Sequence, residues 1–262
     1  MVRPKKYLGQ HFLTDPTIAE RIVSALSTKP GDTVIEIGPG TGVLTGPLLE
    51  RDIQLLPVEI DPESIIHLKN RWPSLEKRLI EEDFLKLNID AYTSDPFHVI
   101  GNFPYNISSQ IFFRVLEYRQ RIPSVICMLQ KEVANRIASP PGSREYGILS
   151  VLLQAYFDIQ YLFTVKPGSF FPPPKVTSGV IRLTRNSTIS LPCDEKLFFL
   201  VVKSTFNQRR KMIRNSLKSI LLNLDSNFEL LSKRPEQLGV PEFIELTRWV
   251  ESQQTTNRLG NS

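Results

Sequence analysis

Short apolar runs alternate with longer stretches of helical spacing from about residue 33 onward. Each run is rich in β-branched residues and is apolar throughout rather than at every second position. That pattern is typical of a strand buried on both faces of a parallel sheet. The runs predicted to form strands are residues 33–38, 55–60, 79–83, 97–102 and 125–129.

Between these strands lie segments with the periodicity of amphipathic helices. The predicted helices are residues 43–51, 62–70, 108–118 and 132–138. Strands and helices in alternation predict an α/β fold, in which helices cover both faces of a mostly parallel sheet. Two later runs, 161–165 and 179–185, flank a proline-rich loop and are expected to close the sheet as a strand pair.

A change of character follows this sheet. The segment from Asn186 to Pro192 has the polar, proline-containing composition of a linker, and residues 194–250 show helical periodicity without a convincing strand. We therefore expect two domains, an α/β domain at residues 1–185 and a small helical domain at residues 190–262.

The composition limits the size of the core, the kinds of partner and the kinds of cross-link that we expect. The chain has 262 residues with 41% hydrophobic content, enough for one sizeable core and a small second domain. Its net charge of +5 fits an acidic partner as well as a solvated basic surface. Cys127, Cys193 and the three histidines show no metal-ligand spacing, so we expect neither a disulfide nor a bound metal.

The chain offers no sign of a membrane or an export signal. Its first eight residues are basic and lack the apolar core of a signal peptide. No apolar run approaches the roughly 20 residues of a membrane span. We therefore expect a cytoplasmic protein.

The first predicted strand leads into a glycine-rich loop, EIGPGTGV, at residues 36–43. Gly38, Gly40 and Gly42 allow the backbone to turn sharply and to approach a ligand without a Cβ in the way. The helix that follows would direct N–H groups toward that ligand. Such a loop at the carboxyl end of the first strand is typical of nucleotide sites, although glycines can also form a simple tight turn.

Three further residues narrow down the ligand. The dinucleotide fingerprint requires Gly or Ala where this chain has Val43, which disfavours a pyrophosphate-containing cofactor. Glu59 ends the second strand, and its carboxylate can accept hydrogen bonds from both hydroxyls of a ribose. A ligand with a ribose and no phosphate, such as S-adenosylmethionine, fits both observations. Asp83 could accept from the adenine amine, although an aspartate there is more often a cap or turn former.

The fourth strand ends in Asn102-Phe103-Pro104-Tyr105, the most informative segment of the chain. An exocyclic adenine amine is a poor nucleophile because its lone pair is delocalised into the ring. The amide oxygen of Asn102 and a carbonyl of a turn fixed by Pro104 can accept from its two protons. Tyr105 offers a flat face for a flipped-out base. The alternative, a plain Asn-Pro turn, is weaker at a cofactor-binding strand end.

A basic segment lies in the predicted helical domain. From residue 196 to residue 224 the chain has seven Lys or Arg residues and no acid. Helical spacing would place Arg210, Arg214 and Lys218 on one face, where they could neutralise RNA phosphates or simply face solvent. The residues expected to bind RNA are Arg209, Arg210, Lys211, Arg214 and Lys218.

Together these motifs resemble those of the ribosomal RNA small-subunit adenine dimethyltransferases. The resemblance runs from about Lys6 to Val250. It rests on LGQHFL at 8–13, EIGPGTG at 36–42, Glu59, Asp83-Phe84, NFPY at 102–105, FFPPPKV at 170–176 and NQRRK at 207–211. This combination is far more specific than any single motif.

The resemblance implies a fold, an activity and partners. The fold is a Rossmann-like, seven-stranded methyltransferase domain that binds S-adenosylmethionine, followed by a small all-helical RNA-binding domain. The activity is N6,N6-dimethylation of two adjacent adenosines in a hairpin near the 3′ end of 16S small-subunit RNA, late in subunit biogenesis. The expected partner is therefore a pre-30S particle, and we expect a monomeric enzyme without a metal.

The resemblance also implies the residues of the site. The expected cofactor-binding residues are His11, Leu13, Gly38, Gly40, Glu59, Asp83 and Asn102. The expected catalytic residues are Asn102, Pro104, Tyr105 and Phe171, with the rings of Tyr105 and Phe171 on either side of the target adenine. The chain departs from the family at His11, usually Asn, and at Phe103, usually Leu; we expect both changes to be tolerated.

Three alternatives compete with this interpretation. Large-subunit adenine methyltransferases of the antibiotic-resistance type share most motifs of the first domain, but the segment 207–211 favours the small-subunit branch. A non-catalytic assembly factor would bind RNA without transferring methyl groups, and the intact Glu59, Asn102 and Tyr105 argue against it. A nicotinamide-dependent oxidoreductase is disfavoured by Val43.

Overall fold

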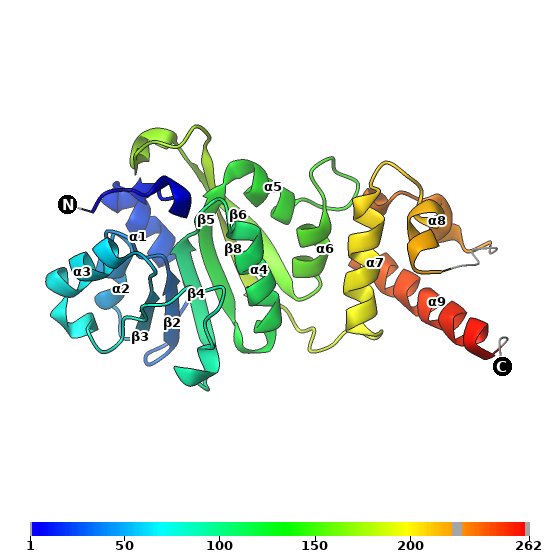
Figure 1. Ribbon diagram of the computed structural model, residues 1–262, viewed down its shortest axis with the longest axis horizontal. Helices are drawn as coiled ribbons and strands as arrows, with labels where there is room; N and C mark the ends of the chain where they lie inside the picture. The colour runs from blue at the N-terminus through cyan, green and yellow to red at the C-terminus, as the bar shows by residue number, and fades with distance from the viewer. Residues whose placement is uncertain (1, 222–226, 260–262) are drawn as a thin grey trace. The chain divides into compact units, whose positions relative to one another are not determined.

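A computed structural model describes residues 2–221 and 227–259 (Figure 1). The chain divides into two compact units, Met1–Asn135 with Asp158–Arg185, and Arg136–Phe157 with Asn186–Ser262. The division after residue 185 lies where the sequence predicted a linker. Residues 136–157, which the sequence assigned to the α/β domain, group instead with the helical unit. Residues 222–226 and 260–262 of the expected helical domain lie outside the described residues.

The first unit is built on a six-stranded sheet. The strands, in sheet order, are β3 (Gln54–Val58), β2 (Thr33–Ile37), β4 (Phe97–Asn102), β5 (Ser124–Gln130), β8 (Ser178–Arg185) and β6 (Phe157–Val165). β2 runs parallel to β3 and β4, β4 runs parallel to β5, and β8 is antiparallel to β5. Because Ile37 is in register with both Val58 and Gly101, the carboxyl ends of three parallel strands meet at one edge.

The third predicted strand, residues 79–83, is reduced to a single bridge. Ile80 pairs in parallel with Val58, donates its N–H to the Pro57 carbonyl and accepts from the N–H of Glu59. The acidic residues 81 and 82 are exposed and do not suit a pleated, half-buried surface. The sheet therefore has six full strands rather than the expected seven, with Ile80 at the position of the missing one.

Helices cover the sheet as the alternating pattern predicts. They are α1 (Pro16–Ser24), α2 (Thr45–Leu49), α3 (Pro62–Arg71), α4 (Ser108–Glu117) and α5 (Lys131–Ala138). On one face Ile22 of α1 and Leu48 of α2 pack into a cluster with Val34, Ile100 and Ile126. Each is buried, and each such side chain contributes about 1.5–3 kcal/mol of burial free energy. In Figure 1, α4 crosses in front of the strands.

Two helices of the first unit begin in the same way. α1 and α3 each start with Asp-Pro, and Pro at the first helical position is preorganised for a helix. The Asp15 carboxylate accepts from the N–H groups of Thr17 and Ile18, and Asp61 accepts from the N–H of Glu63. Before α1, a short strand β1 (Phe12–Leu13) pairs antiparallel with β7 (Phe170–Phe171), which brings the proline-rich loop next to the N-terminal segment.

The second unit contains α6 (Ile148–Gln154), α7 (Glu195–Asn207), α8 (Ile213–Ser216) and α9 (Val240–Leu259). Its core includes Phe206, whose ring stacks on Phe243 at 5.9 Å between centroids and meets the edge of Tyr146 at 6.1 Å. The described part of residues 194–250 contains no strand, as the sequence predicted. No helix in the described ranges is long and apolar enough to cross a membrane.

Candidate functional site

A pocket opens where the carboxyl ends of β2, β3 and β4 meet, which is where ligands bind in open α/β sheets. Five separate segments line it: residues 8–12, the glycine loop at 37, 38 and 40, residues 58–60, residues 82–84, and residues 102–105 with 107. It brings together most of the site residues predicted from the sequence, namely His11, Gly38, Gly40, Glu59, Asp83, Asn102, Pro104 and Tyr105.

The charge of this pocket is one-sided. Three carboxylates line it, from Glu59, Glu82 and Asp83, while no Lys or Arg is found among its lining residues. A pyrophosphate would meet no cation here, whereas a ligand with a positive charge is electrostatically favoured. Within the described ranges, no group of three His, Cys, Asp or Glu side chains could hold a metal ion.

The glycines of the loop are required for different reasons. Gly38 lines the pocket with a left-handed φ of 64°, and a Cβ added there would meet no protein atom within 4 Å. Its missing side chain therefore leaves space for a ligand. Gly42, in contrast, would place a Cβ 2.3 Å from the indole of Trp72. Its hydrogen is required by protein packing, which the sequence pattern alone did not reveal.

Glu59, directly after β3, holds the glycine loop against the pocket. Its Oε2 accepts from the N–H of Gly40 at 2.9 Å, and its Oε1 accepts from the N–H groups of Ile60 and Asp61, both at 2.9 Å. Burial raises the pKa of this carboxyl, and the three backbone donors oppose that rise. Because each carboxylate oxygen can accept about two hydrogen bonds, Oε2 retains a position for a ribose hydroxyl.

Glu36 lies buried behind the loop, a feature that sequence analysis did not single out. Its carboxylate accepts from the Thr45 hydroxyl at 2.8 Å and the residue is 1% exposed. Burial raises its pKa to about 8. The only sequence signal was its place at the start of the EIGPGTG motif. The short helix α2 begins at Thr45, two residues later than predicted.

Asp83 serves both the local turn and the pocket. Its Oδ1 accepts from the N–H of Leu85 at 2.9 Å, which makes it a turn former, as the simpler interpretation held. The same residue lines the pocket with Phe84. Its second carboxylate oxygen is therefore the candidate acceptor for the adenine amine of a cofactor.

Asn102, the last residue of β4, has its amide orientation fixed by the protein. Its Nδ2 donates to the backbone carbonyl of His11 at 2.8 Å. A carbonyl oxygen can only accept, so the bond assigns the nitrogen and leaves Oδ1 as the acceptor that Asn102 offers to the pocket. This is the atom that the proposed chemistry requires.

The Tyr105 ring is held from two directions. Its hydroxyl shares a hydrogen bond of 2.7 Å with the Ser178 hydroxyl, and the His11 ring stacks on it at 5.5 Å between centroids. His11 Nδ1 lies 2.8 Å from the Pro172 carbonyl, which fixes Nδ1 as the donor. Burial raises the pKa of Tyr105. One face of the tyrosine ring is thus covered by His11.

Two predicted site residues do not line the pocket. Leu13 is 2% exposed and packs in the hydrophobic core, whereas its neighbour Phe12 faces the pocket, because successive strand residues point to opposite sides. Phe171 is 57% exposed and is absent from the pocket lining. It is in register with Phe12 in the β1–β7 pair, which places it next to the pocket wall.

Some pocket residues that were not predicted lie within or directly beside the motifs. Gln10 and Phe12 belong to the LGQHFL segment, and Ile60 follows Glu59 directly. Ile60 is 50% exposed although it is a large apolar residue. The available signal was an exposed apolar residue directly after the acid that the sequence predicts to bind a ribose.

Comparison with known proteins decides the family. A family model described as ribosomal RNA adenine dimethylase matches residues 1–236. The chain belongs to this family.

Similar proteins in this family cover the chain along its whole length. A protein named ribosomal RNA small subunit methyltransferase A from Bacteroides thetaiotaomicron is 54% identical over 268 residues, covering 100% of this chain and 99% of that protein. The protein of the same name from Flavobacterium johnsoniae is 55% identical over 255 residues, covering 96% of this chain and 97% of the relative.

Solved structures agree with this assignment. A dimethyladenosine transferase from Plasmodium falciparum superposes with a TM-score of 0.78 at 25% identity, covering 93% of this chain and 98% of that chain. The 23S rRNA methyltransferase ErmE gives 0.66 at 26% identity, covering 90% and 99%. The fold is therefore the Rossmann-like fold of ribosomal RNA methyltransferases, as the motifs implied.

The basic segment of this family member differs from the continuous helix predicted. α7 ends at Asn207, and α8 has only four residues, Ile213–Ser216. The intervening turn interrupts the helix, so Arg210, Arg214 and Lys218 do not share one helical face. The expected RNA-binding residues Arg210, Lys211, Arg214 and Lys218 are nevertheless all exposed.

Arg209 has a different environment from the other four basic residues. Its Nη2 donates to the Ser143 carbonyl at 3.3 Å, and its Nε lies 4.0 Å from Glu236 Oε2. Both partners belong to the helical unit. Arg209 therefore joins the 139–147 loop to the basic turn, in addition to any RNA contact.

Proposed function

We propose that this protein transfers methyl groups from S-adenosylmethionine to N6 of two adjacent adenosines in a hairpin near the 3′ end of 16S ribosomal RNA. The observation that carries the proposal is the pocket itself. It has three carboxylates and no Lys or Arg, and it lies beside an asparagine amide whose oxygen is left as an acceptor.

The residues present fit this cofactor. The open space at Gly38 accommodates the part of the ligand next to the glycine loop, and Glu59 Oε2 is available to a ribose hydroxyl. Ile60 and Phe84 offer apolar surface for adenine, with Asp83 as the acceptor for its amine. When bound, S-adenosylmethionine supplies an electrophilic methyl group on a positively charged sulfonium, which the acidic lining favours.

The chain's own residues act on the target adenine. Asn102 Oδ1 accepts from one proton of the amine and a carbonyl of the Phe103–Pro104 turn accepts from the other, which directs the nitrogen lone pair toward the methyl group. The base stacks on the face of Tyr105 that His11 leaves uncovered. No strong base is required, because the methylated amine is cationic and releases its proton readily. Exposed Phe171 is proposed to contact the base from the rim.

The small-subunit RNA is favoured over the large-subunit RNA. The relatives that are 54% and 55% identical to this chain are named small-subunit methyltransferases. The NQRRK segment at 207–211 favours the same branch. We place the reaction in the cytoplasm, on a pre-30S particle, by a monomer without a metal. A catalytic first unit and an RNA-binding helical unit complete the proposal.

The exposed basic residues of the helical unit are proposed to bind RNA phosphates. Replacing Arg214 and Lys218 with Gln should weaken RNA binding and reduce the slope of log affinity against log salt by about one for each phosphate that is no longer neutralised. Arg248→Gln, at another exposed position of the same unit, is the matched control. Binding titrations at several salt concentrations make the measurement, and an unchanged slope in the double variant would count against RNA binding by these two residues.

The activity is tested by incubating the protein and labelled S-adenosylmethionine with unmethylated small or large subunits, followed by nucleoside mass spectrometry. We expect N6,N6-dimethyladenosine in small-subunit RNA alone. Label confined to large-subunit RNA would support the antibiotic-resistance type of enzyme. Absence of label from both, with small-subunit binding retained, would support a non-catalytic assembly factor.

A further inference from the structure

The N-terminal segment, residues 2–11, forms a wall of the cofactor pocket, and its one buried apolar side chain is that of Val2, which is 7% exposed. Residues Leu8 to His11 line the pocket. Within the segment, the regular element that the structure describes is a 3-10 turn, Lys6–Leu8, which contains no buried residue. A segment with so few apolar contacts opens easily unless specific polar contacts hold it.

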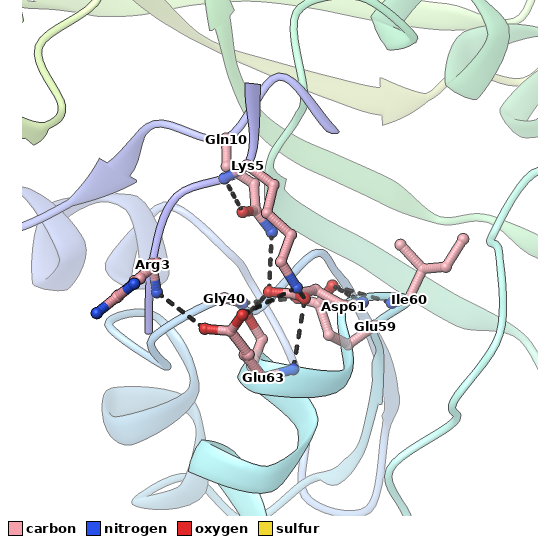
Figure 2. Close-up of polar contacts among 9 residues, drawn as sticks. Arg3, Lys5, Gln10, Gly40, Glu59, Ile60, Asp61 and Glu63 are labelled. Atoms are coloured by element: carbon pink, nitrogen blue, oxygen red, sulfur yellow. Dashed lines mark hydrogen bonds and ion pairs between the residues drawn. The ribbon is translucent and has the colours of Figure 1, made fainter. Parts of the chain in front are cut away.

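Polar contacts to the start of α3 hold this segment (Figure 2). The Lys5 ammonium contacts the Asp61 carboxylate and lies 3.4 Å from Glu63 Oε1. The Gln10 side chain donates from Nε2 to Asp61 Oδ2 at 3.3 Å and accepts from the Lys5 N–H at 2.8 Å. Two positions of the segment, residues 5 and 10, are therefore tied to one carboxylate.

Asp61 is an unusually firm anchor. Its side chain is 0% exposed, and it also accepts from the Ser64 hydroxyl at 2.9 Å as part of the helix cap. Burial alone would raise its pKa, but hydrogen bonds from Lys5, Ser64 and Gln10 outweigh burial and lower the pKa. The contact with Asp61 raises the pKa of Lys5, so both partners are charged at neutral pH. Removing one partner of such a pair leaves a buried charge uncompensated.

The same anchor touches the proposed ribose site. The Asp61 N–H donates to Glu59 Oε1 at 2.9 Å, beside the oxygen that we assign to a ribose hydroxyl. The anchor of the segment and the cofactor-binding carboxylate are thus neighbours two residues apart. A movement of the segment away from Asp61 would uncover the pocket at its ribose end.

We propose that the contact of Lys5 and Gln10 with Asp61 is a latch that holds the N-terminal segment over the cofactor, so that its strength sets the rate of cofactor release. The inference rests on the proposed function. Dimethylation of two adenosines requires four methyl transfers, and the spent cofactor must leave after each. Lys5 is therefore a positioning residue for cofactor exchange.

Lys5→Met tests the latch, because it retains the length of the side chain and removes its charge. Lys6→Met is the matched control, since Lys6 is the exposed neighbour and has no ion pair within the described ranges. Lys5→Arg is the conservative variant that should restore the contact. Two readouts are required: hydrogen exchange of the 2–12 peptide in the ligand-free protein, and dissociation of labelled S-adenosylhomocysteine after rapid dilution.

We expect Lys5→Met to accelerate both exchange and dissociation by at least about tenfold, with Lys6→Met and Lys5→Arg close to the unaltered protein. Unchanged exchange in Lys5→Met would overturn the latch. Faster exchange with unchanged dissociation would overturn its role in cofactor release. If the unaltered protein binds no S-adenosylhomocysteine, the proposed function fails, as does the role in cofactor release, while the exchange measurement still decides whether the latch exists.

Discussion

The two ends of the sheet in the first unit carry similar polar side chains and use them differently. At the amino ends of the strands, His98 Nδ1 shares a 2.7 Å hydrogen bond with the Ser124 hydroxyl, and Nε2 lies 3.3 Å from Asp32 Oδ2. At the carboxyl ends, Asn102 satisfies its amide nitrogen and leaves its oxygen to the pocket. In the first set, which we call the closed set, the polar groups pair with one another. In the second, the open set, an acceptor is left to the pocket.

The closed set shows why residue type alone does not identify a site. Serine, histidine and aspartate in contact are the groups of a hydrolase triad, and as in a triad both ring nitrogens of His98 have partners. His98 is 6% exposed and Ser124 8%, and burial lowers the pKa of His98. A nucleophilic serine must reach its substrate, so this network is a structural one.

The open set shows the opposite case, in which groups at the strand ends are left without protein partners. Gly38 lacks a neighbour where its side chain would be, and Asn102 directs an acceptor toward space rather than toward a protein donor. Folding alone would favour filling that space and pairing that oxygen. The unfilled space and the unpaired oxygen therefore indicate that ligands bind at the carboxyl ends of the strands.

The largest expected effect concerns Glu36, whose buried carboxyl lowers the stability of the folded protein when it is charged. Glu36 has a pKa of about 8 in the folded protein, against about 4.3 when unfolded. Its contribution to stability is therefore complete below about pH 4 and is lost as the pH rises through 8. Glu36→Gln should abolish this dependence. The stability of the variant relative to the unaltered protein should increase by about 5 kcal/mol between pH 4 and pH 9.

Urea unfolding at several pH values measures this difference. Exposed Glu76 supplies the control, Glu76→Gln, whose stability should follow that of the unaltered protein at every pH. Parallel curves for Glu36→Gln and the unaltered protein would show that Glu36 titrates normally.

Asn102→Ala should lower the rate of methyl transfer about a thousandfold, because it removes the acceptor aimed at the reacting amine. Cofactor affinity should fall less than about fivefold, since the variant lacks only one neutral hydrogen bond, to the His11 carbonyl. Single-turnover methylation and equilibrium binding separate the two effects. Asn88→Ala, at an exposed asparagine, is the control, and normal turnover in Asn102→Ala would refute the role assigned to the amide.

Gly38→Ala should reduce cofactor affinity by more than about tenfold, because the methyl group enters the pocket and a left-handed residue other than glycine costs about 1–2 kcal/mol. Gly31→Ala separates these causes: its φ is 84° and its Cβ would also meet no atom within 4 Å, but it does not line the pocket. Calorimetric titration should show normal affinity in Gly31→Ala. Equal reductions in both variants would assign the effect to backbone strain.

Ser124→Ala should have the smallest effect. Removal of the hydroxyl leaves a buried His98 nitrogen without its partner and should destabilise the protein by about 1–3 kcal/mol. Methyl transfer measured well below the melting temperature should not change. A decrease in activity that exceeds the decrease in folded protein would contradict the assignment of this network as structural.

The sequence predicted best where topology fixes position. Glu59 directly follows β3 and Asn102 ends β4, and these two strands lie on either side of β2 and run parallel to it. The alternation of elements implied that such strand ends meet at one edge of the sheet. Leu13 was expected in the pocket, whereas Phe12 lines it and Leu13 is buried in the core, because a strand of two residues has no periodicity from which to read its buried side. The basic residues after Asn207 were placed on one helix, because the turn at 208–212 has no proline or glycine to announce it.

Contacts between distant segments were beyond sequence analysis for a different reason. Residues 136–157 combine a proline- and glycine-containing loop with a short helical run, and only their packing in three dimensions assigns them to the helical unit. The contact of Lys5 with Asp61 joins residues 56 positions apart. Neither a lysine near a chain terminus nor an Asp-Pro helix start specifies its partner.

The packing of Trp72 on Gly42 gives the protein an intrinsic optical probe. The chain has two tryptophans; Trp72 lies against the glycine loop, and Trp249 stacks on Phe228 in the helical unit. With Trp249 replaced by Phe, ultraviolet emission would report the loop alone. Ligand entry could then be followed in real time without a label.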